Sequence, residues 1–489
     1  MSLFRVYTPG QWLANPSLMT PLLFCTLGGL FSLGMAPYNV MPVAMLAFIF
    51  FLNQLLNCHL PKEAFKYTFL FALVHFSLAS NWMVQPFLEA MEASLWKYPA
   101  GLLGLLVVTV FMAFITALAM FVAISINRHF ISSNVGRVLC ISLCWVLGEM
   151  FRYWPLDYLA YIFIDTLYLV QLASVVGLFP FTFLLVSAFG FMALFDRGMF
   201  MGVYILLAMV SYGFVRLELL EQQPPSEQIK VRLVNASLSK KNMQKIGGKQ
   251  ALADHYIQLS ITDSEAMKVR RNAQPDLIIW PESATTLMLE NGEKQKVSRE
   301  YITSFMTKEQ RLITGGIRRV IDRKEKRFRY HNSVFLLRGD GQLLGSFDKQ
   351  RLVPWGEFVP LREYLPKGMG NTFVSYNLKA GEGARKLTYR ANLNILPLIC
   401  LENYFPYLLS EQQTNQKFIV LTGSESLFAG TTEPSQYLVS ARFRAIESGL
   451  PLVTASNMGY LAIIDKYGQL VKASFSGSAQ VLDGVVDIE

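Results

Sequence analysis

Three reactive side chains lie just after short apolar runs in the second half of this chain. Glu282, Lys349 and Cys400 each follow the end of such a run by one or two residues. The runs are Asp276–Trp280, Leu343–Phe347 and Leu393–Ile399. Their length and composition indicate buried strands, and α/β folds expose functional groups at strand ends. We therefore expect a carboxylate, an amine and a thiol to meet if these strands are neighbours.

Together these side chains would support acyl transfer through a thioester. A thiol is a weak nucleophile until its proton is removed, and a carboxylate such as Glu282 can accept that proton. A lysine such as Lys349 lowers the pKa of a thiol and stabilises the oxyanion of a tetrahedral intermediate. Such a set needs no histidine. The second half of the chain has only His255 and His331, and neither is in a setting typical of a catalytic triad.

Each of the three residues taken singly also fits an inert role. An isolated cysteine at a strand end is more often packing, a lone Trp-Pro-Glu is more often a solvated turn, and a lone Asp-Lys is usually surface. Their order and combination favour chemistry. The five cysteines show no paired or metal-ligand spacing, so we expect no disulfide framework, no metal and no cofactor.

From about residue 221 onward, short apolar runs alternate with helical stretches, as in α/β domains. Further strands are expected at Ile229–Val234, Arg311–Gly315, Ser333–Leu337, Phe418–Thr422, Leu450–Ala455 and Tyr460–Ile464, and helices near 241–270, 293–308 and 434–448. The stretch from Arg318 to Arg329 is dense in charge. For it, a solvated loop is favoured over a contact with lipid headgroups.

Charge is unevenly distributed along the 489 residues, of which only 16% are charged and 52% apolar. Soluble domains average about 25% charged residues. The deficit lies before about Leu220, and the chain from Glu221 to Glu489 has the composition of a soluble domain. We therefore assign residues 1–220 to a transmembrane domain and 221–489 to a catalytic domain, with Gln222–Ser226 as a short linker.

The first domain contains about seven runs long enough to cross a membrane, which needs about 20 apolar residues. They lie near 18–36, 39–57, 66–84, 100–126, 137–152, 167–194 and 199–217. Two residues in them are polar neighbours. Glu149 and Arg152 are spaced i,i+3 at one helix end, which fits either a mutually satisfied surface pair or a polar lining beneath the soluble domain.

The loop charges predict which side of the membrane the catalytic domain occupies. Cytoplasmic loops carry an excess of Lys and Arg. With the N-terminus inside, six of these residues are cytoplasmic and two external: Arg5, Lys62, Lys66, Arg128, Arg137 and Arg197 against Lys97 and Arg152. Seven spans then place the second domain outside. The net charge of +9 also fits attraction to anionic phospholipid, whereas the basic residues form no pattern typical of nucleic-acid binding.

The ordered motifs of the second domain resemble those of the nitrilase superfamily. They are Trp280-Pro281-Glu282, the more specific stretch Asp348–Pro360 (DKQRLVPWGEFVP), and Ile399-Cys400-Leu401-Glu402. Behind a multi-span segment they resemble the apolipoprotein N-acyltransferase family, the membrane-bound branch of that superfamily. The resemblance covers nearly the whole chain.

This resemblance implies a fold and a set of roles. It makes Glu282 the base, Lys349 the oxyanion stabiliser and Cys400 the nucleophile, with Glu357 as a second active-site carboxylate and Glu402 beside the nucleophile. It implies a multi-span helical domain followed by an α/β nitrilase-like αββα sandwich, and no metal. It also implies a multi-pass protein of the bacterial inner membrane whose catalytic domain is periplasmic, in agreement with the loop charges.

The implied reaction has two substrates held in the bilayer. Cys400 takes an acyl chain from a phospholipid, and the N-terminal amine of a diacylglyceryl-cysteine in an apolipoprotein then takes the chain from the thioester. The expected partners are therefore a phospholipid donor, a diacylated apolipoprotein acceptor and the bilayer. Anchoring both substrates beside the catalytic domain raises their effective concentration.

Four features depart from the family pattern. Leu401 replaces an aromatic residue, the segment that contains Glu425–Phe428 differs from the usual SNDAWFG, Asn235–Lys249 lacks a tryptophan, and no apolar run for a last spanning helix precedes Glu489. These departures leave two alternatives open. One is a membrane-tethered amidase or an acyltransferase with another acceptor, as in conjugal-transfer relatives, and the other is a non-catalytic membrane scaffold.

Overall fold

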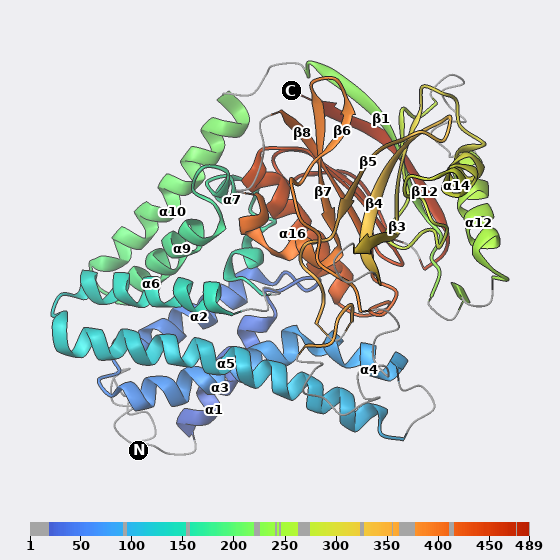
Figure 1. Ribbon diagram of the computed structural model, residues 1–489. Coiled ribbons are helices and arrows are strands. Elements are labelled where there is room, and N and C mark those ends of the chain that lie inside the picture. Colours follow the sequence, from blue (N-terminus) through green and yellow to red (C-terminus); the bar gives the residue numbers. More distant parts are fainter. Residues whose placement is uncertain are drawn as a thin grey trace. The chain divides into compact units, whose positions relative to one another are not determined.

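The computed structural model describes residues 19–90, 95–152, 157–219, 225–239, 242–243, 246–262, 274–322, 327–354, 356–360, 377–409, 415–475 and 477–488. Figure 1 shows an all-helical first part, in blue to green, and a part rich in strands, in green to red. The chain divides into two compact units, Met1–Gln222 with Thr431–Val439 and Gln223–Gly430 with Ser440–Glu489. The start of helix α16 (Glu433–Ser448) therefore belongs with the first unit.

Apolar helices make up the first unit. They are α1 (Met19–Ser32), α2 (Met41–Leu56), α3 (Pro61–Ala79), α4 (Gln85–Ala90), α5 (Lys97–Phe130), α6 (Asn134–Phe151), α7 (Leu167–Val170), α8 (Ala173–Val176), α9 (Leu178–Met192) and α10 (Gly198–Phe214). A proline lies in the first turn of α2 and of α3, where a missing N–H costs no hydrogen bond. Leucine, phenylalanine and methionine occur on all sides of most of these helices, as expected of helices surrounded by lipid and by one another.

Three helices among the described residues are long and apolar enough to cross a membrane: Lys97–Phe130, Asn134–Phe151 and Gly198–Leu219. A fourth span results if Pro61–Ala79 and Asn81–Glu89, bent by 65° at their junction, act as one. Four shorter apolar helices cover the remaining predicted spans: Met19–Ser32, Met41–Leu56, Leu167–Val176 and Leu178–Met192. Seven spans therefore stay a prediction.

The apolar run predicted to span the membrane over 167–194 is not one continuous helix. Gly177, at φ +79°, lies between α8 and α9 and breaks the run into separate helices. Only glycine adopts this left-handed conformation without strain, so the break is encoded at that position. An apolar run by itself indicates burial in lipid or protein but does not reveal where the backbone turns.

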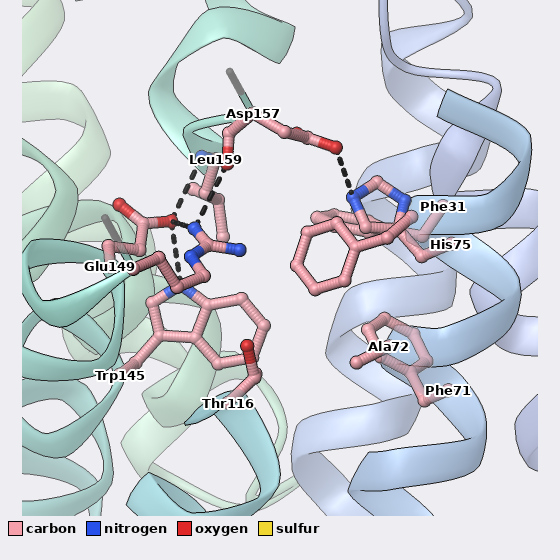
Figure 2. A pocket seen from close by; sticks show the side chains of 11 residues that line it. Phe31, Phe71, Ala72, His75, Thr116, Trp145, Glu149, Asp157 and Leu159 are labelled. Carbon is pink, nitrogen blue, oxygen red and sulfur yellow. Dashed lines mark hydrogen bonds and ion pairs between the residues drawn. The ribbon is translucent and has the colours of Figure 1, made fainter. Parts of the chain in front are cut away.

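Glu149 and Arg152 are buried, so of the two alternatives left open by the sequence the surface pair is wrong. Arg152 Nη2 lies 3.4 Å from Glu149 Oε1 and donates to the carbonyl of Asp157 at 2.9 Å. Glu149 Oε1 also accepts hydrogen bonds from Trp145 Nε1 at 3.1 Å and from the backbone N–H of Leu159 at 3.0 Å. Figure 2 shows these side chains lining a small pocket of the first unit.

A second buried pair lines the opposite side of this pocket. His75 Nε2 lies 3.0 Å from Asp157 Oδ2, and both side chains are buried. Charges in an apolar helical bundle are costly unless paired. The two pairs meet at Asp157, which contacts His75 through its side chain and Arg152 through its carbonyl. They hold the segment after α6 against α3 within the first unit.

Two sheets form the second unit within the described residues. The first has the order β12-β1-β2-β3-β4-β5 and the second β11-β10-β9-β8-β7-β6. The strands of the first are β12 (Gln480–Ile488), β1 (Glu227–Asn235), β2 (Leu277–Ile279), β3 (Arg311–Asp322), β4 (Arg327–Arg338) and β5 (Leu343–Asp348). Those of the second are β11 (Leu470–Ser474), β10 (Leu461–Ile464), β9 (Leu452–Asn457), β8 (Gln416–Ser424), β7 (Leu393–Ile399) and β6 (Leu387–Arg390).

The sheets pack face to face with helices outside them, which confirms the expected αββα sandwich. One apolar core joins residues of both sheets, including Leu233, Ile279, Ile399 and Val453. A second core lies between the other face of the first sheet and helices α12 (Lys249–Ile261) and α14 (Glu293–Thr303). Helix α16 connects the parallel neighbours β8 and β9, and a crossover of that kind lies on a sheet face.

Sequence patterns missed three strands and misjudged one loop. β6, β11 and β12 were not expected, since β6 and β11 are short and β12 is only half apolar. The stretch 318–329 was expected to be a solvated loop, but β3 continues to Asp322 and β4 begins at Arg327. Charged side chains do not oppose strand formation at a sheet edge exposed to water, so charge density was a poor guide there.

Candidate active site

The strand ends carry the three reactive side chains to one region. Strands β1, β2 and β3 are parallel, β4 is antiparallel to β3, and β5 is antiparallel to β4, so β2 and β5 end at the same edge of the first sheet. Glu282 follows β2, and Lys349 follows β5 directly. Cys400 follows β7 of the facing sheet. The structure therefore places all three side chains just after strand ends, as expected.

Lys349 is fully buried between two carboxylates. Its Nζ lies 3.0 Å from Glu357 Oε2 and 3.7 Å from Glu282 Oε1, and its side chain is 1% exposed. The backbone N–H of Val353 donates to Glu357 Oε2 at 2.8 Å, which fixes that carboxylate in the loop after Lys349. Glu357, expected only from the resemblance, is thus the closer partner of the lysine.

Asn332 on β4 connects the two carboxylates and was missed by the sequence analysis. Its Nδ2 donates to Glu282 Oε1 at 2.5 Å and to Glu357 Oε1 at 2.7 Å. Its carbonyl accepts from the backbone N–H of Lys349 at 2.8 Å. The strand predicted at Ser333–Leu337 stopped one residue short of it. The polar side chain of Asn332 beside a predicted buried strand was the sequence signal that could have identified it.

Cys400 contacts Glu282 at the start of a short 3-10 helix. The thiol and the Glu282 carboxyl share a hydrogen bond, and the lysine ammonium interacts electrostatically with the same sulfur. Cys400 has φ +49°, a left-handed conformation that is uncommon for a residue with a β carbon. Such backbone conformations cluster at active sites. The side chain is half-buried.

Burial and charge set the ionisation of these groups. Burial raises the pKa of Glu282 above its ordinary value, the Lys349 ammonium opposes that rise, and the negative Glu357 adds to it. Burial alone would lower the pKa of Lys349, but Glu357, Cys400 and Glu282 together raise it, so the lysine stays charged. A carboxylate with a raised pKa is the better base toward a thiol.

Glu402 is saturated with hydrogen bonds and ties two loops together. Its carboxylate accepts from the backbone N–H groups of Ile399 at 3.0 Å, Gln350 at 2.8 Å and Arg351 at 3.2 Å. It also accepts from both terminal nitrogens of Arg385, at 2.9 and 3.1 Å. Glu402 therefore holds the turn of Cys400 against the loop after Lys349.

Arg385, which sequence reasoning also missed, completes this tie. Its side chain is 2% exposed, and it donates to Gln350 Oε1 at 2.7 Å and to the carbonyl of Pro397 at 3.2 Å. Its guanidinium lies over the Phe347 ring, 4.8 Å from the centroid. A lone arginine in a loop has no sequence signal that distinguishes it from a surface residue.

Two of the four departures from the family pattern lie around the same strand ends. Leu401, beside the nucleophile, is half-buried. Glu425 follows β8, the parallel neighbour of β7, and is 3% exposed. Gly459 packs directly on its carboxylate, because a β carbon there would lie 2.2 Å from Glu425 Oε2. Trp355, within the Asp348–Pro360 stretch, lies outside the described residues.

The assembled groups have the geometry of covalent catalysis by a thiol. The Glu282 carboxyl contacts the Cys400 thiol, and the buried Lys349 ammonium lies beside both, so this arrangement could support nucleophilic chemistry by the thiol. No group of three or more His, Cys, Asp or Glu side chains that would hold a metal ion occurs among the described residues. The five expected site residues are all present at this edge, with Asn332 and Arg385 in addition.

Comparison with known proteins finds two family models along the chain. Residues 27–191 match the apolipoprotein N-acyltransferase N-terminal domain, and residues 236–487 match the carbon-nitrogen hydrolase family. The resemblance expected from the motifs is thereby confirmed for both parts of the chain.

Curated relatives agree with these matches. An apolipoprotein N-acyltransferase of Rhizobium etli is 27% identical over 443 residues, 87% of this chain and 80% of that protein. The one of Rhodopseudomonas palustris is 28% identical over 477 residues, 93% of this chain and 87% of that protein. Nit3 of Saccharomyces cerevisiae, a nitrilase-superfamily structure, aligns with 54% of this chain and 92% of its own at 18% identity and a TM-score of 0.40.

Proposed function

We propose that this chain, which belongs to the carbon-nitrogen hydrolase family, is an N-acyltransferase that moves an acyl chain from a phospholipid to the N-terminal amine of a diacylated apolipoprotein. The observation that carries the proposal is the contact of Cys400 with Glu282 and Lys349, in a chain whose first part matches the N-terminal domain of apolipoprotein N-acyltransferases. The names of the relatives support the same acceptor.

In the first half-reaction, Glu282 accepts the Sγ proton of Cys400 and the thiolate attacks the phospholipid ester carbonyl. Lys349 stabilises the negative oxygen that forms, since a fixed buried cation interacts strongly with developing charge. The ester C–O bond breaks, Glu282 returns the proton to the leaving glycerol oxygen, and a lysophospholipid departs. The acyl group remains on Cys400 as a thioester.

In the second half-reaction, the acceptor amine attacks the thioester. Glu282 takes a proton from the attacking nitrogen and gives it to the sulfur as the C–S bond breaks. An amide forms and the thiol is restored. Glu357 keeps Lys349 in place through both steps, because its carboxylate lies 3.0 Å from Nζ.

The membrane part favours a lipid-anchored acceptor over water. In the part of the chain that the structure describes, three or four helices long enough to span, with four shorter apolar ones, would hold the catalytic domain where both substrates reside. The six-to-two bias of loop Lys and Arg supports a catalytic domain on the periplasmic side of the inner membrane. A soluble amidase would have no use for such a part.

A direct test supplies the reconstituted enzyme with phospholipid and a diacylated lipopeptide. One peptide carries a free N-terminal amine, and its control carries an acetylated amine. We expect a triacylated amide product from the free amine alone. Equal fatty-acid release with either peptide, and no amide, would make the protein a lipid or amide hydrolase.

A different amine acceptor is the second candidate. Leu401 beside the nucleophile and the buried Glu425 at the end of β8 are the positions where this chain departs from the family pattern. They lie where an acceptor would approach. Transfer to small amines but not to the lipopeptide, in the same assay, would favour this candidate.

A further inference from the structure

The hairpin of β3 and β4 extends beyond the neighbouring strands at the end of the first sheet where the candidate active site lies. The two strands pair from Arg311 opposite Arg338 to Asp322 opposite Arg327, and Figure 1 shows them as long yellow-green to yellow strands. β3 is parallel to β2, whose carboxyl end carries Glu282. The far end of the hairpin therefore projects from the same edge as the catalytic groups.

Two apolar side chains are exposed at that far end. Ile321 is 63% exposed and lies directly opposite Phe328, which is 49% exposed. Cross-strand neighbours of this kind share one face of a hairpin. Adjacent apolar side chains exposed on one face can serve as a small contact surface.

The same face carries an active-site residue. Asn332, which bonds Glu282 and Glu357, is four residues from Phe328 along β4, and side chains two residues apart share a face. Four residues of strand span roughly 14 Å. The apolar pair thus lies at a fixed distance from the catalytic carboxylates, on one rigid element.

The sequence around this pair is rich in basic residues. The stretch 318–329 contains seven Lys and Arg and two acidic residues, namely Arg318, Arg319, Arg323, Lys324, Lys326, Arg327 and Arg329 against Asp322 and Glu325. Arg318 is neutralised by Asp348, and Arg319 lies 3.7 Å from Glu290 while its guanidinium stacks 4.6 Å from the Phe328 centroid. The net charge of the stretch stays positive when its two acidic partners, Asp348 and Glu290, are counted with it.

We propose that the end of this hairpin, formed by Arg319, Ile321, Phe328 and Arg329, docks on a bilayer surface that contains anionic phospholipid. Ile321 and Phe328 enter the interface between headgroups and acyl chains, and the arginines bind lipid phosphates. Docking presents the strand ends of the first sheet to the layer that holds the lipid substrates. The inference rests on the proposed function for its purpose, but its test requires no acyl transfer.

The test measures how readily a thiol at the hairpin end reacts from water. The full chain with Ile321→Cys is placed in nanodiscs of phosphatidylcholine alone or with phosphatidylglycerol. A water-soluble maleimide is added, and peptide mass mapping gives the alkylation rate at position 321. The matched control is Val297→Cys on α14, which is 67% exposed and lies on the outer helical layer. Alkylation of Cys400 in the same digest reports on the fold.

We expect alkylation at position 321 to be about tenfold slower in the discs with phosphatidylglycerol, since a few basic contacts to anionic lipid supply a difference of that size. High salt and the pair Arg319→Glu with Arg329→Glu should remove the difference. The pair Lys294→Glu with Lys296→Glu on α14 should leave it. Position 297 should react equally in both discs.

Equal rates at position 321 in the two kinds of disc would overturn the proposal. Slowing that appears only when polyglutamate is added would assign the hairpin to an acidic protein partner and would overturn it as well. Either result leaves the lipopeptide assay unaffected, so failure of this inference is distinguishable from failure of the proposed acyltransferase.

Discussion

Lys349 contacts its two carboxylates unequally, and that inequality separates their roles. Glu357 lies 3.0 Å from the ammonium and accepts further hydrogen bonds from Val353 and Asn332, whereas Glu282 is 3.7 Å away and contacts Cys400. A carboxylate fully engaged with a cation is a poor base. Glu282 is therefore the group that can take the thiol proton, and Glu357 is the anchor of the lysine.

At this scale the motifs identified the residues to which the proposed function gives the chemistry, but not the residues that contact and position them. Glu282, Lys349 and Cys400 stand beside recognisable strands and turns, so their order along the chain was informative. Asn332 and Arg385 act through partners 17 to 50 residues away in sequence, Asn332 on Glu282 and Glu357 and Arg385 on Glu402. Such contacts arise from the pairing of strands, which one sequence does not specify.

The pH dependence of acylation tests the assignment of Glu282. Acylation requires the ionised carboxylate, and the negative charge of Glu357 is one cause of the raised pKa of Glu282. Replacing that charge with Glu357→Gln removes one cause of the rise and leaves Lys349 to lower the pKa further. The acid limb of the rate should therefore move to lower pH, although the maximal rate falls.

The measurement is the rate of Cys400 acylation by a water-soluble ester across the acid range. Asp340→Asn is the control, because Asp340 lies in the turn between β4 and β5, at the other end of these strands. An acid limb that stays in place or moves to higher pH in Glu357→Gln would contradict the assignment.

At the scale of secondary-structure elements, the candidate site is formed by loops that follow strand ends. Glu402 and Arg385 join two of these loops through hydrogen bonds. Strand positions were largely predictable because buried runs such as Leu393–Ile399 are apolar and bounded by turns. The far part of the β3–β4 hairpin, beyond the predicted strands Arg311–Gly315 and Ser333–Leu337, was not predicted, since that end is charged and its pairing is set by register across two strands. Edge strands β6 and β11 are too short for a periodic signal.

Variants of the Arg385–Glu402 pair should show different effects on thermal stability and on catalysis. Removing one partner of a buried ion pair costs about 3–5 kcal/mol, while replacing both with apolar residues is often neutral. Arg385→Met and Glu402→Met should each lower the thermal midpoint, and the double variant should recover most of the loss. The turnover number should stay low in all three, because the ties from Glu402 to the backbone of Gln350 and Arg351 are lost or disturbed.

Thermal unfolding and kcat in nanodiscs measure the two effects. The buried Arg444–Glu447 pair on α16 is the control, since Arg444→Met with Glu447→Met should change stability without lowering kcat. If kcat recovers along with the midpoint in the Arg385→Met and Glu402→Met double variant, the pair is structural only.

For the whole molecule, the shift in charge density near residue 220 was the strongest sequence signal. It predicted an apolar helical part and an α/β part because membranes exclude charge and soluble surfaces require it. No comparable sequence signal indicated that the start of α16 belongs with the first unit. This association depends on Gln436, which donates to the carbonyls of Ala36 and Ala79 and accepts from Trp82 Nε1. A single glutamine forms no periodic pattern, so the sequence did not reveal these contacts.

The central claim is that Cys400 carries the acyl chain, and intact-mass analysis tests it most directly. The purified full chain is incubated with phospholipid of one defined acyl chain and no acceptor, then weighed before and after hydroxylamine. We expect a mass increase of one acyl group that hydroxylamine removes, and none in Cys400→Ala. A hydroxylamine-sensitive acyl adduct that persists in Cys400→Ala would contradict the account.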